Sequence, residues 1–282
     1  MKKLLYLLAL SIGSLQLTSA QILTPAASPE QTIIQKVGLT DVTVRYARPS
    51  MHGRTIFGDL VPYGALWRTG ANQNTTVSFS EAVEIGGGEL AAGTYAIYTK
   101  PGETAWEVYF YTDTDNWGNP SDWDPAKVAA SLKVTVQPIK NAVETFTISF
   151  DQLESDAVML SLFWEHVYVA VPVKFMTDKA VMASIEQTME GPSSGDYYNA
   201  AVYYLNADKD MSVAKQWIDK SIAMRTSPAF WYYRQQSLIY AKSGDKKGAI
   251  AAAKMSLDLA REAGNNDYVK MNEKAIKEWE GK

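Results

Sequence analysis

The chain of 282 residues contains no cysteine and only two histidines. Without cysteine, the sequence excludes disulfide bonds, thiolate metal ligands, a cysteine nucleophile and lipid attachment through cysteine. Stability must therefore come from the packed core. The shortage of histidine also disfavours a serine hydrolase, because only His52 and His166 could serve as its base and no G-x-S-x-G elbow occurs.

The chain also has little positive charge and, after its first residues, no long hydrophobic run. Its 27 basic and 31 acidic residues give a net charge of −4, which argues against a nucleic-acid or anionic-membrane partner. Lys2 and Lys3, the apolar residues 4–10 and a small-residue site before Gln21 are typical of a secretory signal cleaved after Ala20. We therefore expect an exported, soluble protein, periplasmic or extracellular, without a transmembrane segment.

Short segments between about residues 32 and 175 alternate apolar and polar side chains and are rich in Val, Ile, Thr and aromatic residues. This period of two predicts β-strands. Eight strands are predicted, at residues 40–48, 75–80, 94–99, 106–111, 132–137, 144–150, 158–164 and 167–173. Because no helical segment separates them, they predict an antiparallel β-sandwich or barrel over residues 21–175.

Residues 176–282 differ in character, with Ala, Lys, Glu, Met and Tyr at helical spacing. Two segments 35 positions apart align Ala214 with Ala249 and Ser221 with Ser256, an offset that resembles the tetratricopeptide repeat. The resemblance implies an all-α repeat-like domain, and short arrays of this kind bind or brace another protein. A generic helical bundle is the alternative.

The densest group of functional side chains lies within residues 46–76. Between residues 45 and 68 there are four arginines, no lysine and one acid, Asp59, and arginine favours bidentate hydrogen bonding or stacking. One interpretation is a pocket for a small anionic or sugar-like ligand or an envelope polymer, bound by His52, Arg54, Asp59, Tyr63, Trp67, Arg68 and Asn72. The other is an internal brace, in which Arg54 pairs with Asp59 and Arg68 binds carbonyl groups.

Several blocks around this stretch form a specific set: Ser28-Pro29, Arg48-Pro49, Gly53-Arg54, Phe57-Gly58-Asp59, Val61-Pro62-Tyr63, Trp67-Arg68-Thr69-Gly70-Ala71-Asn72 and Thr75-Thr76. Together they resemble the secreted bacterial family catalogued as domain of unknown function 2911. The resemblance covers roughly residues 28–173. It implies membership of a family without an assigned activity, so it contributes no catalytic residues.

Three functions stay open at this stage. The leading one is non-catalytic binding, with the helices docking onto a partner protein. The second is a glycan hydrolase of the cell envelope that uses Asp59 and a second acid, and the third is a purely structural envelope protein. An enzyme is the less expected outcome.

Residues 113–124 begin like a calcium loop, with Asp113, Asp115 and Gly118 at the first, third and sixth positions. Trp117 replaces a ligand at the fifth position, and Asp124 replaces the usual glutamate at the twelfth. A hairpin loop with Trp117 tucked onto the sheet is the better interpretation. No phosphate loop, dinucleotide fingerprint or His-Cys cluster occurs, so we expect no cofactor and no metal.

Overall fold

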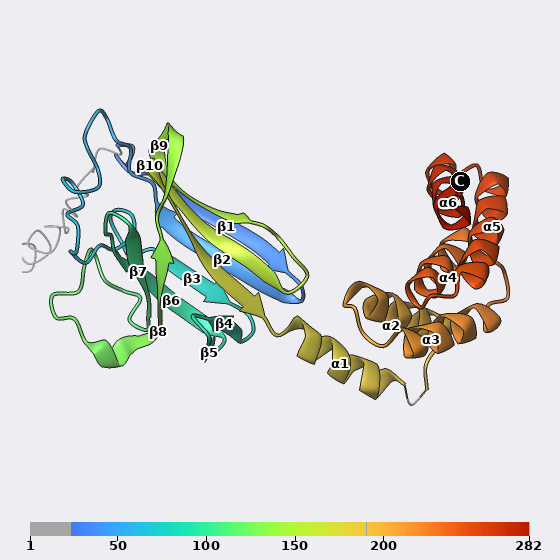
Figure 1. The fold of residues 1–282 in the computed structure, drawn as a ribbon. Helices are drawn as coiled ribbons and strands as arrows, with labels where there is room; N and C mark the ends of the chain where they lie inside the picture. Colours follow the sequence, from blue (N-terminus) through green and yellow to red (C-terminus); the bar gives the residue numbers. More distant parts are fainter. Residues whose placement is uncertain (1–23, 190, 282) are drawn as a thin grey trace, which may run out of the picture. The chain divides into compact units, whose positions relative to one another are not determined.

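The computed structural model describes residues 24–189 and 191–281. The predicted secretory signal at residues 1–20 lies outside these ranges. The chain divides into two compact units, with the boundary between Thr177 and Asp178 (Figure 1). Along the described ranges, no helix is long and apolar enough to cross a membrane.

The first unit consists of two antiparallel sheets. One has the strand order β1-β2-β3-β6-β7-β8 and the other β5-β4-β10-β9. The strands are β1 (Glu30–Val37), β2 (Thr40–Ala47), β3 (Thr76–Phe79), β4 (Val83–Ile85), β5 (Gly88–Leu90), β6 (Gly93–Lys100), β7 (Ala105–Tyr111), β8 (Val128–Thr135), β9 (Gln137–Asp151) and β10 (Ala157–Phe175). The predicted antiparallel β part is confirmed.

The strand prediction differs from the structure at β10 and at three strands that it omits. The segments predicted at residues 158–164 and 167–173 are one continuous strand, β10, whose register against β9 shifts on either side of Glu165. Glu165 has a φ of 54°. Glu165 and His166, which separate the two predicted segments, therefore form a bulge within one strand. The short β4 and β5, and the half-exposed β1, have too little apolar alternation to be recognised.

Both sheets contribute to one hydrophobic core, and two of its aromatic side chains come from a loop. This loop joins β2 to β3 and is called the motif loop here (residues 48–75). Phe57 and Trp67 of the motif loop lie against Trp106 of β7, Phe146 of β9 and Trp164 of β10, with ring centroids 4.9 to 6.2 Å apart. The motif loop is therefore part of the folded core.

The second part of the chain is all helical. The helices are α1 (Thr177–Thr188), α2 (Ser194–Asn206), α3 (Met211–Ala223), α4 (Phe230–Lys242), α5 (Lys246–Glu262) and α6 (Asn266–Glu280). A β part followed by an all-α part, as predicted, is confirmed (Figure 1).

The same kind of side-chain hydrogen bond occurs in two helix pairs of this unit. In the first pair the Ser221 hydroxyl donates to the Ser194 carbonyl at the start of α2, at 2.7 Å. In the second the Ser256 hydroxyl donates to the Phe230 carbonyl at the start of α4, also at 2.7 Å. Ser221 and Ser256 are the residues that the sequence offset aligns, and both are fully buried. The tetratricopeptide assignment itself stays a prediction.

Candidate functional site

Two carboxylates from the sheet that contains β9 and β10 hold the motif loop in place. Glu165 of β10 accepts the backbone N–H groups of Ile56 and Phe57, at 3.4 and 3.2 Å. Glu144 of β9 accepts the N–H of His52 at 2.9 Å. Because backbone donors need partners when a loop enters the core, these two acids fix the path of the loop's first half.

Removal of the Glu165 carboxylate should destabilise the first unit. In Glu165→Ala the amides of Ile56 and Phe57 lose their acceptor, and we expect the free energy of unfolding to fall by about 1–3 kcal/mol. Urea denaturation measures this. Glu103→Ala, the same change at an exposed glutamate, is the control and should stay within about 0.5 kcal/mol of the unaltered chain. Equal stability of the two variants would show that Glu165 does not hold the loop.

Trp67 belongs to the core of the first unit. Its backbone pairs with Thr99 of β6 through hydrogen bonds of 2.8 and 2.9 Å, and its indole N–H donates to the Gly70 carbonyl at 3.1 Å. The side chain is 7% exposed and stacks on Trp164, with centroids 5.8 Å apart. Any ligand beside Trp67 would therefore touch only an edge of the ring.

The turn that follows Trp67 is tightly constrained. Thr69, Gly70 and Asn72 all have positive φ, at 58°, 149° and 59°. A Cβ atom on Gly70 would lie 3.0 Å from the Ala47 carbonyl oxygen, so glycine permits this close approach. The Asn72 side chain donates to the Ser28 carbonyl at 3.2 Å. The turn thus holds the segment before β1 against the motif loop.

Arg68 is half-buried, and its side chain has no hydrogen-bond or ion-pair partner among the described residues. Its Nε atom is buried without a hydrogen-bond acceptor, and no described carboxylate forms an ion pair with it. Burial lowers the pKa of the Arg68 guanidinium, and the Tyr98 hydroxyl opposes that shift only in part. A Cβ atom at Gly118 would lie 4.0 Å from Arg68 Nη1, so the guanidinium reaches toward the loop after β7. Its positive charge is uncompensated within the described part of the chain.

Arg54 does not pair with Asp59. Its Nε donates to the Met51 carbonyl at 2.8 Å and its Nη2 to the Ser50 carbonyl at 2.6 Å, while the side chain stays exposed. These bonds orient the guanidinium and use two of its five N–H donors. The remaining donors are free to bind another group.

Arg54 and Arg68 line one cavity of ≈ 640 Å³, called the basic pocket here. Its described lining includes no acidic residue, although the whole chain carries a net charge of −4. The wall combines these arginines and His52 with a larger apolar surface. The lining residues are Ala27, Ser28, Pro49, Ser50, His52, Arg54, Leu60, Val61, Trp67, Arg68, Gly70, Ala71 and Trp164.

The structure brings together four of the seven predicted ligand residues. His52, Arg54, Trp67 and Arg68 share the basic pocket. The other three do not line it. Asp59 is exposed, the Tyr63 ring, 44% exposed, packs beside Gly58, and Asn72 lines a second cavity.

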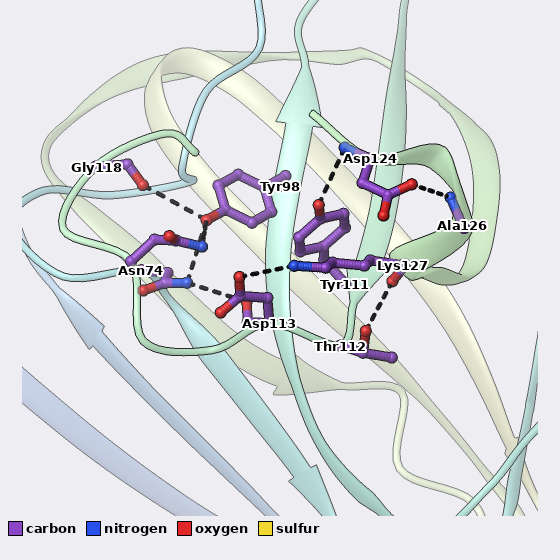
Figure 2. Close-up of polar contacts among 10 residues, drawn as sticks. Asn74, Tyr98, Tyr111, Thr112, Asp113, Gly118, Asp124, Ala126 and Lys127 are labelled. Carbon is purple, nitrogen blue, oxygen red and sulfur yellow. Dashed lines mark hydrogen bonds and ion pairs between the residues drawn. The ribbon is translucent and has the colours of Figure 1, made fainter. Parts of the chain in front are cut away.

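This second cavity, of ≈ 520 Å³, is called the amide pocket here. It lies where the turn of the motif loop meets the loop after β7. Its lining residues are Glu30, Arg45, Tyr46, Ala47, Asn72, Gln73, Asn74, Thr76, Thr114, Asp115 and Trp117. Asn74 supplies the buried side of the wall, and its Nδ2 donates to the Tyr98 hydroxyl at 3.1 Å (Figure 2).

The expectation that Trp117 is tucked onto the sheet is wrong. Its side chain is 74% exposed. Trp123 from the same loop packs on the sheet instead, stacked on Tyr111 with centroids 4.5 Å apart and edge-on to Tyr98 at 5.6 Å. Because Trp123 covers these rings, the sheet offers no comparable place to Trp117.

The loop after β7 is not arranged as a calcium site. The Asp113 carboxylate forms an ion pair with Lys127 at 3.3 Å, and Asp124 caps the 3-10 helix η1 (Pro125–Lys127) by accepting from Ala126 (Figure 2). In the described ranges no group of three or more His, Asp or Glu side chains is placed to hold a metal ion.

By its fold, the protein is a two-part chain: a unit of two antiparallel β-sheets is followed by a helical unit. A loop embedded in the core of the first unit forms the basic pocket. The model of the family described as protein of unknown function DUF2911 matches residues 28–173, and the chain belongs to that family. The match covers every lining residue of the amide pocket and all but Ala27 of the basic pocket. A search among curated proteins returned no match, and neither did a search among solved structures.

Proposed function

We propose that the first unit binds a small organic anion in the basic pocket. The observation that carries this proposal is Arg68, a half-buried guanidinium with no described partner, beside a lining without acids. A carboxylate or phosphate group of the ligand would supply the missing negative charge. The binding is non-catalytic.

An unpaired cation in a partly buried position is unfavourable, because it loses water without gaining a counter-charge. An anion bound at Arg68 would form charge-assisted hydrogen bonds, which are about twice as strong as neutral ones. Arg54 can join through its free N–H groups, and His52 through its ring nitrogens. Because the Arg68 guanidinium is already partly desolvated in the empty protein, an anion would gain its hydrogen bonds without a further large desolvation penalty at this group.

The remainder of the wall favours a ligand with an apolar body. Leu60, Val61 and the edges of Trp67 and Trp164 line the same cavity as the cations. Pockets of this composition bury the apolar part of a ligand and orient it through a few polar contacts. An aromatic or short aliphatic carboxylate or phosphate monoester combines both features.

The cellular setting is part of the same proposal. Cleavage after Ala20 would place the protein in the periplasm or outside the cell, and the boundary near residue 175 would separate a ligand-binding domain from helices that dock onto a partner protein. The hydrolase alternative has weaker support, because Asp59 is exposed and neither Asp59 nor any other described acid lines the basic pocket. The buried Trp67 is consistent with a structural role for that one residue.

Three matched probes test the proposal: phenyl phosphate, benzoate and the neutral benzamide. Isothermal titration of the full chain should show binding of phenyl phosphate and benzoate, and an affinity for benzamide at least tenfold lower, about 1.4 kcal/mol. Added salt should weaken the two anions and leave benzamide unaffected. Equal affinity for all three probes, or no binding of either anion, would refute the anion site.

A further inference from the structure

The amide pocket has a different chemistry from the basic pocket. Its only described cation, Arg45, is already paired with Glu30 at 2.7 Å. Asp115 adds one negative charge that no described residue pairs with. The remaining polar wall is made of amides and hydroxyls, so the electrostatics oppose an anion and favour a neutral polar ligand.

We propose that the amide pocket is a second binding site, for a neutral sugar ring of a glycan. Sugar hydroxyls both donate and accept hydrogen bonds, and the side chains of Asn72, Gln73 and Asn74 offer both functions within one wall. A pyranose ring also has an apolar C–H face. The indole of Trp117, 74% exposed at the same cavity, provides an apolar surface with a polar N–H.

Several polar groups of this wall have unused hydrogen-bonding capacity. Asn74 is buried, and its Nδ2 donates to Tyr98, but its Oδ1 has no partner among the described residues. Buried polar atoms without a partner are rare in proteins and are commonly satisfied by water or a ligand. The exposed side chains of Gln73 and Asp115 form no hydrogen bond with any described residue.

Single exposed aromatic residues are common on protein surfaces and need no function. Trp117 differs in being held next to the amides by the backbone. The neighbouring Gly118 N–H donates to the Asn72 carbonyl, and the Asn74 N–H to the Asn116 carbonyl, both at 3.1 Å. These bonds fix two loops against each other, and a preformed wall lowers the entropy cost of binding.

Native gel electrophoresis of the full chain tests this site, with amylopectin, arabinoxylan, galactomannan or mixed-linkage β-glucan cast into the gel. At least one of these neutral polysaccharides should retard the unaltered protein. Trp117→Ala and Gln73→Ala should each weaken that interaction about tenfold or more, measured from the polysaccharide concentration at half-maximal retardation. Trp231→Ala, at an exposed tryptophan of α4, should be retarded like the unaltered protein.

Two results would overturn the proposal. One is no retardation of the unaltered protein by any of the four polysaccharides. The other is retardation of Trp117→Ala equal to that of the unaltered chain. Melting temperatures of the variants, which should be unchanged, separate a lost site from a lost fold. Affinity for phenyl phosphate should also be unchanged in Trp117→Ala, so the outcome is independent of the basic pocket.

Discussion

Replacement of Trp67 by alanine should destabilise the first unit by about 3–5 kcal/mol, the usual cost of emptying a large aromatic site in a core. Trp67 is 7% exposed and contacts Phe57, Trp106, Phe146 and Trp164. Trp106, Phe146 and Trp164 come from strands of both sheets and cannot collapse into the cavity without moving those strands. Thermal denaturation should show a loss of roughly 6–20 °C, since 1 kcal/mol shifts a unit of this size by about 2–4 °C.

Trp117→Ala is the matched control for this prediction. It removes the same side chain from a position that is 74% exposed, and surface substitutions of this kind change stability by about 0.5 kcal/mol or less. If Trp67→Ala melts at the temperature of Trp117→Ala while it abolishes ligand binding, Trp67 is a contact residue of a pocket and its place in the core is wrong.

Replacement of Arg68 by methionine should strongly weaken anion binding and leave the fold intact. Methionine keeps most of the apolar stem and removes an unpaired, half-buried charge. Hydrogen bonds to charged groups contribute about 1.5–3 kcal/mol, so the affinity for phenyl phosphate should fall about 10- to 100-fold. The free energy of unfolding should stay within about 0.5 kcal/mol or rise, because no described hydrogen bond is lost.

Arg45→Met makes the same change in net charge outside the basic pocket and should retain the affinity for phenyl phosphate. The internal-brace interpretation predicts the opposite pattern for Arg68→Met. In that case the variant would lose about 1–3 kcal/mol of stability, because carbonyl groups would lose their donor. Unfolding and titration of the same two variants therefore distinguish a ligand site from a brace.

Much of the β part could be predicted from sequence, because half-buried strands impose a period of two on their residues. The errors arise where tertiary contacts, rather than the local pattern, determine how far a strand extends. Glu165 and His166 interrupt the pattern of β10, but the pairing with β9 continues across the bulge. The helical part was recognisable for the same reason as the strands, through its own period and through the serine positions that recur in α3 and α5.

The candidate site was harder to predict. The motif indicates a loop that lines the basic pocket, but it does not show that Trp67 faces inward and Arg68 does not, since this depends on the pairing of Trp67 with Thr99 in β6. Glu165 lies 108 residues from the Phe57 amide that it accepts, and nothing near either residue indicates the contact. Likewise Trp117 and Trp123 are chemically identical, and only the packed rings around Tyr111 select Trp123.

A crystal structure of the full chain with phenyl phosphate shows directly whether Arg68 binds an anion in the basic pocket. We expect phosphate oxygens within about 3.2 Å of guanidinium nitrogens of Arg68 and Arg54, with the phenyl ring against Leu60 and Val61. Phenyl phosphate bound elsewhere, or an unoccupied basic pocket at a saturating concentration, would rule out this anion site.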